Sequence, residues 1–168
     1  NYNPSFGNPS VVRTLTKAGV ETSDVWTLGT NSGSGTSIAP SRDNTKLYYG
    51  GKNGTSNSAI HVWDLTNDVA LSDLVATVAG FTITGHGILV LADGTILVSY
   101  SNSTTDWKIL HYSAAGAVLN TYDLGAHRFD GFRAALDDPN SFIVKIFSDT
   151  AGLGPNVTFR NIKVSDGS

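Results

Sequence analysis

The residues with side chains suited to binding a polar ligand are concentrated between positions 86 and 133. Two dipeptides, His-Gly at 86–87 and Asp-Gly at 130–131, stand at matching places just before apolar runs, and further cationic side chains surround the second dipeptide. Imidazole, guanidinium and carboxylate groups in neighbouring loops can hold a polar ligand by hydrogen bonds and charge. We therefore predict a ligand-binding patch, with ordinary solvated loop polarity as the alternative, formed by His86, His127, Arg128, Asp130 and Arg133.

An aromatic side chain adds a sixth candidate. Trp107 follows the polar segment 101–106, whereas most other aromatic residues fall within apolar runs. Aromatic rings on strands usually fill a core, and exposed ones can form a platform for a sugar ring. We predict that Trp107 contributes to the ligand-binding patch.

The residue types needed for catalysis are sparse. The chain has no cysteine, a single glutamate at Glu21, and no Gly-x-Ser-x-Gly motif that would place a nucleophilic serine. His61 and His111 lie within apolar runs, where a packed or hydrogen-bonded imidazole is expected. They are offset by one position when the repeats are aligned, so they do not form a repeated set of metal ligands. The sequence predicts no catalytic residues, no metal and no cofactor, and it leans away from an enzyme without deciding the question.

The composition indicates an all-β chain of 168 residues. Its 14 acidic residues include 13 aspartates, methionine is absent, and 18 glycines and 5 prolines cluster between short apolar runs. Straight-chain helix formers are therefore scarce, while turn residues are abundant. This pattern predicts short strands joined by tight turns within one domain, residues 1–168.

Internal repeats refine the prediction. The segments 12–30 and 109–126 align, so that Gly19 and Gly116 correspond at a distance of 97 residues, and partial copies begin at Ile60 and Phe159. The repeat is therefore about 49 residues long. A second element, in which Asp43, Asp93 and Asp138 each begin a turn between two strands, recurs in step with it.

Four antiparallel strands in such a repeat are typical of a β-propeller blade. We predict a propeller-like domain of about 3.4 blades, an incomplete ring because propellers usually close with 4 to 8 blades. The expected boundaries are a partial blade at 10–29, full blades at 37–79 and 86–125, and a three-stranded blade at 131–164. An incomplete ring exposes apolar faces and an unpaired edge, so we expect self-association or blade completion by another chain.

These segments resemble known repeat proteins. Residues 88–98 and 110–116 are similar to the blades of NHL-repeat and gluconolactonase-like propellers, and residues 63–65, 71–74 and 161–167 resemble propeller-like proteins of uncultured tailed phages. The resemblance implies a non-enzymatic binding or structural module, associated with a virion or extracellular, that presents loops to a glycan or surface protein. The alternative that it implies is a lactonase-like hydrolase with its site at the channel mouth.

Charge and hydropathy exclude two classes of partner. The net charge is −3 and basic residues form no cluster, so the phosphate backbone of a nucleic acid has no complementary surface. The longest apolar run is the five residues 88–92, far short of the roughly 20 that cross a bilayer. We expect neither nucleic-acid binding nor membrane insertion.

Overall fold

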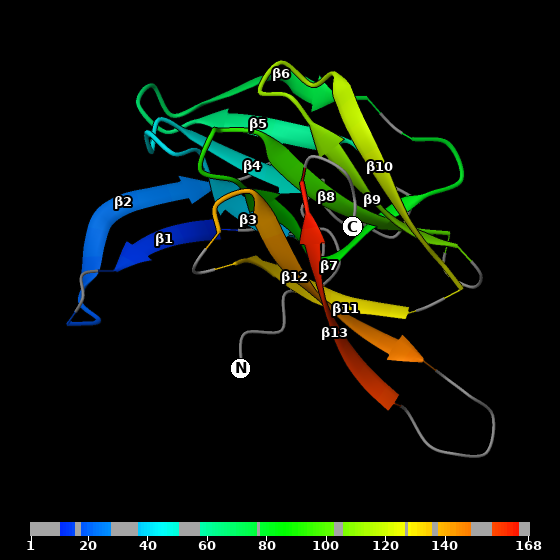
Figure 1. The fold of residues 1–168 in the computed structure, drawn as a ribbon. Helices are drawn as coiled ribbons and strands as arrows, with labels where there is room; N and C mark the ends of the chain where they lie inside the picture. Colours follow the sequence, from blue (N-terminus) through cyan, green and yellow to red (C-terminus); the bar gives the residue numbers. More distant parts are fainter. Residues whose placement is uncertain are drawn as a thin grey trace.

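The computed structural model describes residues 11–15, 18–27, 37–50, 58–76, 78–102, 106–126, 128–135, 138–148 and 156–164. Within these ranges the regular elements are all strands (Figure 1). Every strand pairing in this part of the chain is antiparallel. The predicted all-β class with antiparallel sheets is therefore confirmed.

The strands follow one another in four groups. Their bounds are β1 (Val11–Leu15), β2 (Glu21–Thr27), β3 (Ser37–Pro40), β4 (Lys46–Gly50), β5 (Ile60–Asp64), β6 (Val69–Val75), β7 (Thr82–Val90), β8 (Ile96–Ser101), β9 (Trp107–Tyr112), β10 (Val118–Gly125), β11 (Arg128–Ala134), β12 (Ser141–Ser148) and β13 (Asn156–Lys163).

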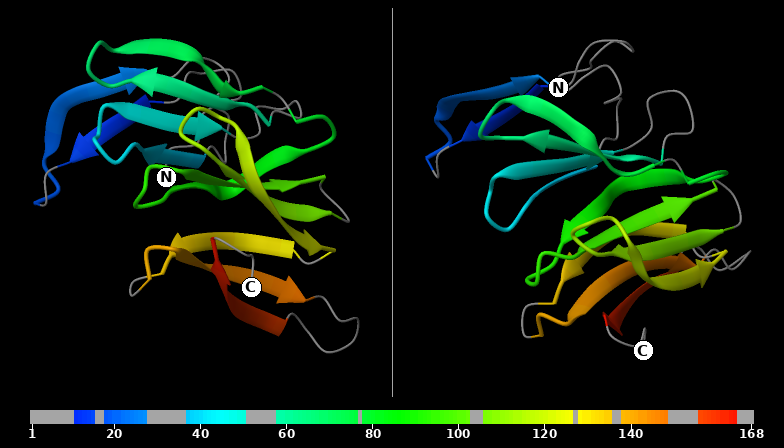
Figure 2. Two further views of the ribbon diagram at one scale, coloured as in Figure 1. Left: turned by 45° about the horizontal axis from the view of Figure 1, so that its top comes forward. Right: turned by 90° about the horizontal axis from the view of Figure 1, so that it is seen from above.

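Each sheet is a meander in which strands adjacent in sequence are adjacent in space. The sheets are β1–β2, β3–β6, β7–β10 and β11–β13. The first strands of the three larger sheets lie together, because β7 contacts both β3 and β11. Figure 2 shows these three sheets as successive layers in chain order. Each four-stranded meander has the up-and-down topology found in a propeller blade; closure of a ring and the number of blades stay predictions.

Two apolar cores separate the three layers. One lies between β3–β6 and β7–β10 and includes Ile60, Ile96 and Val98. The other lies between β7–β10 and β11–β13 and includes Leu97 and Phe142. Successive side chains of a strand point to opposite faces, so β8 contributes to both cores, and all six of its residues are buried, Ser99 and Ser101 included.

Equivalent turns of the repeat share the same backbone conformation. Gly19 and Gly116 both adopt positive φ, at 78° and 84°. Asn44 and Gly94, each directly after the aspartate of its turn, also lie in the left-handed region, at 57° and 84°. Glycine and asparagine tolerate this conformation best, which explains why these residue types recur at the aligned positions.

The first strand of the β7–β10 sheet begins earlier than the expected blade start at residue 86. β7 extends from Thr82, and its pairing with β8 shifts register between Ile83 and Ile88. A Cβ atom added to Gly87 would approach the Thr84 carbonyl oxygen and the Ser99 hydroxyl too closely, so only glycine fits there. The Gly-rich segment 85–87 resembles a turn in sequence but lies within β7, at the place where its pairing with β8 shifts register.

Candidate functional site

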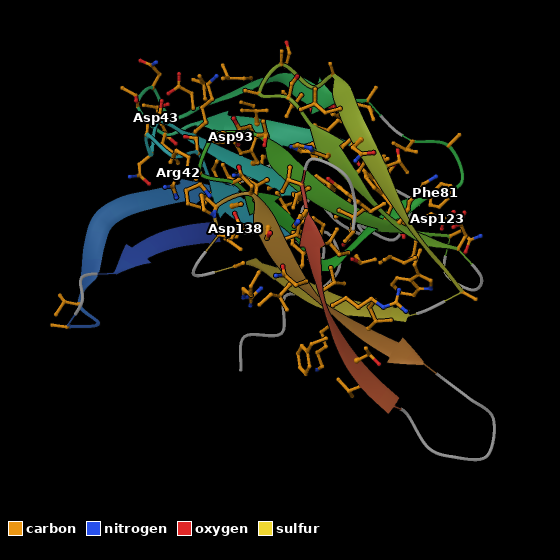
Figure 3. The ribbon with its side chains drawn as sticks, in the orientation of Figure 1. Arg42, Asp43, Phe81, Asp93, Asp123 and Asp138 are labelled. Carbon is orange, nitrogen blue, oxygen red and sulfur yellow. The ribbon has the colours of Figure 1, made fainter. Side chains whose placement is uncertain are left out.

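The sheets have two ends with different chemistry. Turns containing Asp43, Asp93 and Asp138 join the first and second strands of successive sheets, and we call this side the Asp-turn end. Figure 3 shows these three aspartates at one end of the strands and Phe81 and Asp123 at the other. Loops gathered at one end of stacked sheets can jointly contact a ligand.

The three turn aspartates are engaged by their own turns. Asp43 Oδ1 accepts hydrogen bonds from the Ser41 hydroxyl at 2.6 Å and from the Thr45 hydroxyl at 2.9 Å. The same pattern recurs where the Thr95 hydroxyl and amide donate to Asp93 Oδ1, at 2.7 and 2.9 Å. Hydrogen bonds of this kind stabilise the ionised form. They lower the pKa of Asp43 to about 2, and the pKa of Asp138 is lowered by the donating Ser141 hydroxyl and Asn140 amide.

The predicted patch is placed only in part. His127 lies outside the described residues, and the side chains of His86, Arg128 and Asp130 lie outside the described part as well. Their backbone positions correct one expectation, because His86 lies within β7 and Arg128 and Asp130 within β11 rather than in loops before these strands. The two matching dipeptides both coincide with register shifts in a first strand.

The two patch residues with described side chains are not brought together. Trp107 is the first residue of β9, pairs with Ser101 and Gly125, and packs half-buried against the second core. Arg133 lies near the end of β11 at the Asp-turn end, where it is exposed and its Nη1 donates to the Phe132 carbonyl at 2.8 Å. A ligand spanning both would have to cross the length of the sheets. Their role in binding stays a prediction.

The strand histidines are hydrogen-bonded, as the sequence predicts. His61 Nδ1 lies 2.7 Å from Asp73 Oδ1, and its ring packs against Tyr49 with centroids 5.1 Å apart. His111 Nε2 lies 2.8 Å from the Thr95 hydroxyl oxygen. Both interactions are built across neighbouring strands of one sheet.

A groove that the sequence does not predict opens between the β7–β10 and β11–β13 sheets at the Asp-turn end. It has a volume of about 660 Å³ and is open to solvent. Ligand sites commonly enclose about 300–1,000 Å³. Among the residues that the structure describes, those that line this inter-sheet groove are His111, Leu119, Asn120, Asn140 and Val164.

A β-bulge turns two consecutive residues of β10 into the inter-sheet groove. Val118 pairs with Tyr112 and Asn120 pairs with His111, which leaves Leu119 as an extra residue. Adjacent residues of a regular strand point to opposite faces, whereas a bulge redirects one of them. Asn120 lies directly opposite His111, so an amide and an imidazole stand side by side in the groove.

The groove wall contributed by the β11–β13 sheet is tied to its surroundings. The Tyr122 hydroxyl of β10 donates to the Val164 carbonyl at 2.5 Å, which joins the two sheets. The Val164 amide donates to the Asn140 carbonyl at 2.6 Å, and the Asn140 amide donates to Asp138 Oδ1 at 2.9 Å. Asn140 and Val164 are therefore fixed relative to each other although 24 residues separate them.

The hydrogen bonds around His111 determine its tautomer. The single proton of the Thr95 hydroxyl is donated to Asp93, so the Thr95 oxygen must accept from His111 Nε2. Nδ1 of the neutral ring is then an acceptor. Burial lowers the pKa of His111, against the opposing attraction of Asp93, so the neutral ring is favoured near neutral pH.

Nδ1 is the second nitrogen of the His111 ring. The residue is only 6% exposed, and no hydrogen-bond donor to Nδ1 is found among the residues that the structure describes. Every buried side-chain nitrogen or oxygen in that part of the chain has a partner, so an unpartnered Nδ1 must be solvent-accessible. Since His111 lines the groove, we infer that this acceptor is reached from it.

The described residues hold no group of three or more His, Asp or Glu side chains placed to bind a metal ion. They also include no helix long and apolar enough to cross a membrane.

Comparison with known proteins gives little. No family model matches the chain, and no curated protein does. Among solved structures, an α-L-arabinofuranosidase from Clostridium thermocellum matches with a TM-score of 0.47 at 13% sequence identity. The match covers 75% of this chain and 46% of the arabinofuranosidase, so the chain spans less than half of that structure's length. A match at this level assigns neither a family nor an activity, and the likeness to NHL-type and phage propellers stays a resemblance of sequence.

Proposed function

We propose that this chain is a non-enzymatic binding or structural module of the propeller type, presenting the ends of its sheets to a glycan or protein partner. The observation that carries the proposal is the inter-sheet groove, which is walled by two sheets and whose described lining side chains are neutral. Grooves between packed elements, with a few polar groups among apolar ones, are usual places for ligand binding.

The turn aspartates support a structural rather than a catalytic use of the carboxylates. Asp43, Asp93 and Asp138 each accept hydrogen bonds from residues two or three positions later. Their oxygen atoms thereby stabilise the turns on which the Asp-turn end is built. A catalytic carboxylate instead needs a perturbed environment within reach of substrate, as the raised pKa of a general acid shows.

A screen of the chain against a glycan array and a displayed peptide library tests the proposal. We expect saturable binding to either a glycan or a peptide, together with a rise in the melting temperature of the chain, because a ligand that binds only the folded state stabilises it. Absence of binding on both would contradict the proposal. Hydrolysis of lactones accompanied by stabilisation with calcium would instead favour the lactonase-like alternative.

Three further features belong to the proposal. These are completion of the propeller by a second copy or another chain, a location on a virion or outside the cell, and contact of the predicted patch with the partner. Sedimentation at micromolar concentration tests the first, and a monomer without self-association would contradict it.

A further inference from the structure

We propose that the inter-sheet groove, formed by His111, Leu119, Asn120, Asn140 and Val164, binds a neutral saccharide unit through two adjacent hydroxyl groups. This inference rests on the proposed binding function and names the place and the ligand class.

The groove supplies one fixed acceptor from the β7–β10 sheet. His111 lines the groove, its Nδ1 is solvent-accessible and has no hydrogen-bond donor among the described residues, and its Nε2 is bonded to Thr95. An accessible acceptor on a ring fixed in this way selects a ligand group that carries a proton, such as a hydroxyl.

Donors stand beside this acceptor. Asn120 Oδ1 accepts from the Thr121 amide at 2.8 Å, so the Asn120 NH₂ group is the part of the side chain left to donate. Because Asn120 and His111 are cross-strand neighbours, one hydroxyl group can accept from Asn120 and donate to His111. Asn140, on the opposite wall, has an amide that can both donate and accept, which suits a second hydroxyl.

The charge of the lining determines the charge of the ligand. None of the five side chains is anionic, and the only titratable one, His111, is neutral near pH 7 because burial lowers its pKa. Among the described lining residues an anion such as phosphate would find no Arg or Lys partner, and a cation would find no carboxylate. Asp93 and Asp138 belong to the neighbouring turns and are not among the described lining residues; Asp93 Oδ1 and both oxygens of Asp138 accept hydrogen bonds within those turns.

The other two described lining residues are apolar. Leu119 and Val164 stand on opposite walls, and Leu119 is 54% exposed. Saccharides combine hydroxyl edges with patches of C–H groups, so a groove with polar and apolar sides can contact both. A peptide would place its own paired N–H and C=O groups there, and this competitor is an outcome of the test.

The test uses the methyl glycosides of galactose, glucose, mannose, fucose and N-acetylglucosamine, titrated into the ¹⁵N-labelled chain. We expect one of them to shift the backbone amide signals of Thr121 and Val164 and the ¹⁵N signal of His111 Nδ1. The variant Asn120→Asp keeps the acceptor for the Thr121 amide but replaces the donor, so affinity should fall about tenfold or more. Asn161→Asp is the matched control, because it adds the same charge on the outward face of β13 and should leave the affinity unchanged.

Each other outcome overturns the inference in a distinguishable way. Glycoside binding that Asn120→Asp leaves unchanged would place the site elsewhere while the proposed binding function stands. A preference for sialylated over neutral glycans, or binding at the groove of the neutral peptide acetyl-triglycine amide but of no glycoside, would contradict the ligand class. No response to any glycoside here and no binding on the array or peptide library would contradict both this inference and the proposed function.

Discussion

The β7–β10 and β11–β13 sheets differ in how many of their faces are covered. In the first, Ile96, Leu97 and Val98 of β8 are all 0% exposed, because a sheet packs on each side. In the second, Phe142 is 0% exposed, whereas Phe159 on the neighbouring strand is 67% exposed. A phenylalanine on a strand therefore contributes more or less to the free energy of unfolding according to whether another sheet covers its face.

The largest effect should come from a matched pair of substitutions in the β11–β13 sheet. Phe142→Ala removes a ring packed against Tyr122 and Phe132 and should lower the free energy of unfolding by about 3–5 kcal/mol. Phe159→Ala on the open face should change it by less than about 0.5 kcal/mol. Urea unfolding followed by tryptophan fluorescence measures both. Equal costs would mean that the face carrying Phe159 is covered in solution.

A second test concerns the close contact between the β3–β6 and β7–β10 sheets. Gly116→Ala introduces a Cβ at positive φ directly against the Leu74 carbonyl of β6, so we expect a loss of about 2–3 kcal/mol. Gly94→Ala is the control, because it has the same positive φ with no atom nearby and should lose only about 1–2 kcal/mol. Similar losses in thermal unfolding would show that the two sheets can separate at this point.

A third test addresses the junction of the β7–β10 and β11–β13 sheets. Tyr122→Phe removes the hydroxyl that donates to the Val164 carbonyl and should cost about 1 kcal/mol. Amide hydrogen exchange should then increase at Val164, whose amide donates to Asn140. Unchanged protection at Val164 would show that the groove wall does not depend on this bond.

The smallest effect is expected from the turn carboxylates on acidification. Hydrogen bonds from Ser41 and Thr45 lower the pKa of Asp43 from 3.8 to about 2, so its ionised form favours the folded state. That contribution is present above about pH 4 and is lost as the pH falls through about 2. Melting temperatures between pH 5 and pH 2 should fall less for Asp43→Asn than for the unsubstituted chain. Parallel curves for both would show that the turn is not coupled to folding.

Much of the fold follows from local chemistry that is visible in the sequence. The aligned aspartate turns and the Ala-Gly turns have the same backbone conformations at Asn44 and Gly94 and at Gly19 and Gly116. The run 96–98 is apolar at successive positions, as a strand packed on both faces requires, and all three of its residues are buried. These features depend on residues within about five positions of each other, so a single sequence contains the information.

The early start of β7 could not be predicted in the same way. Gly-His-Gly at 85–87 has the composition of a turn, and only the pairing with β8 shows that the segment is an irregular part of a strand. The same limit applies to the first strand of the β11–β13 sheet, where Asp130-Gly131 coincides with a register shift.

The sequence by itself determined the strand-forming segments and the turn conformations, because each depends on short-range propensity and periodicity. Only the tertiary structure decided that His111 and Asn120 face Asn140 and Val164 across two sheets, and that Leu119 joins them through a bulge. The physical reason is that a groove is a property of how sheets pack and shift in register, and no local pattern specifies which residues of one sheet will meet those of another.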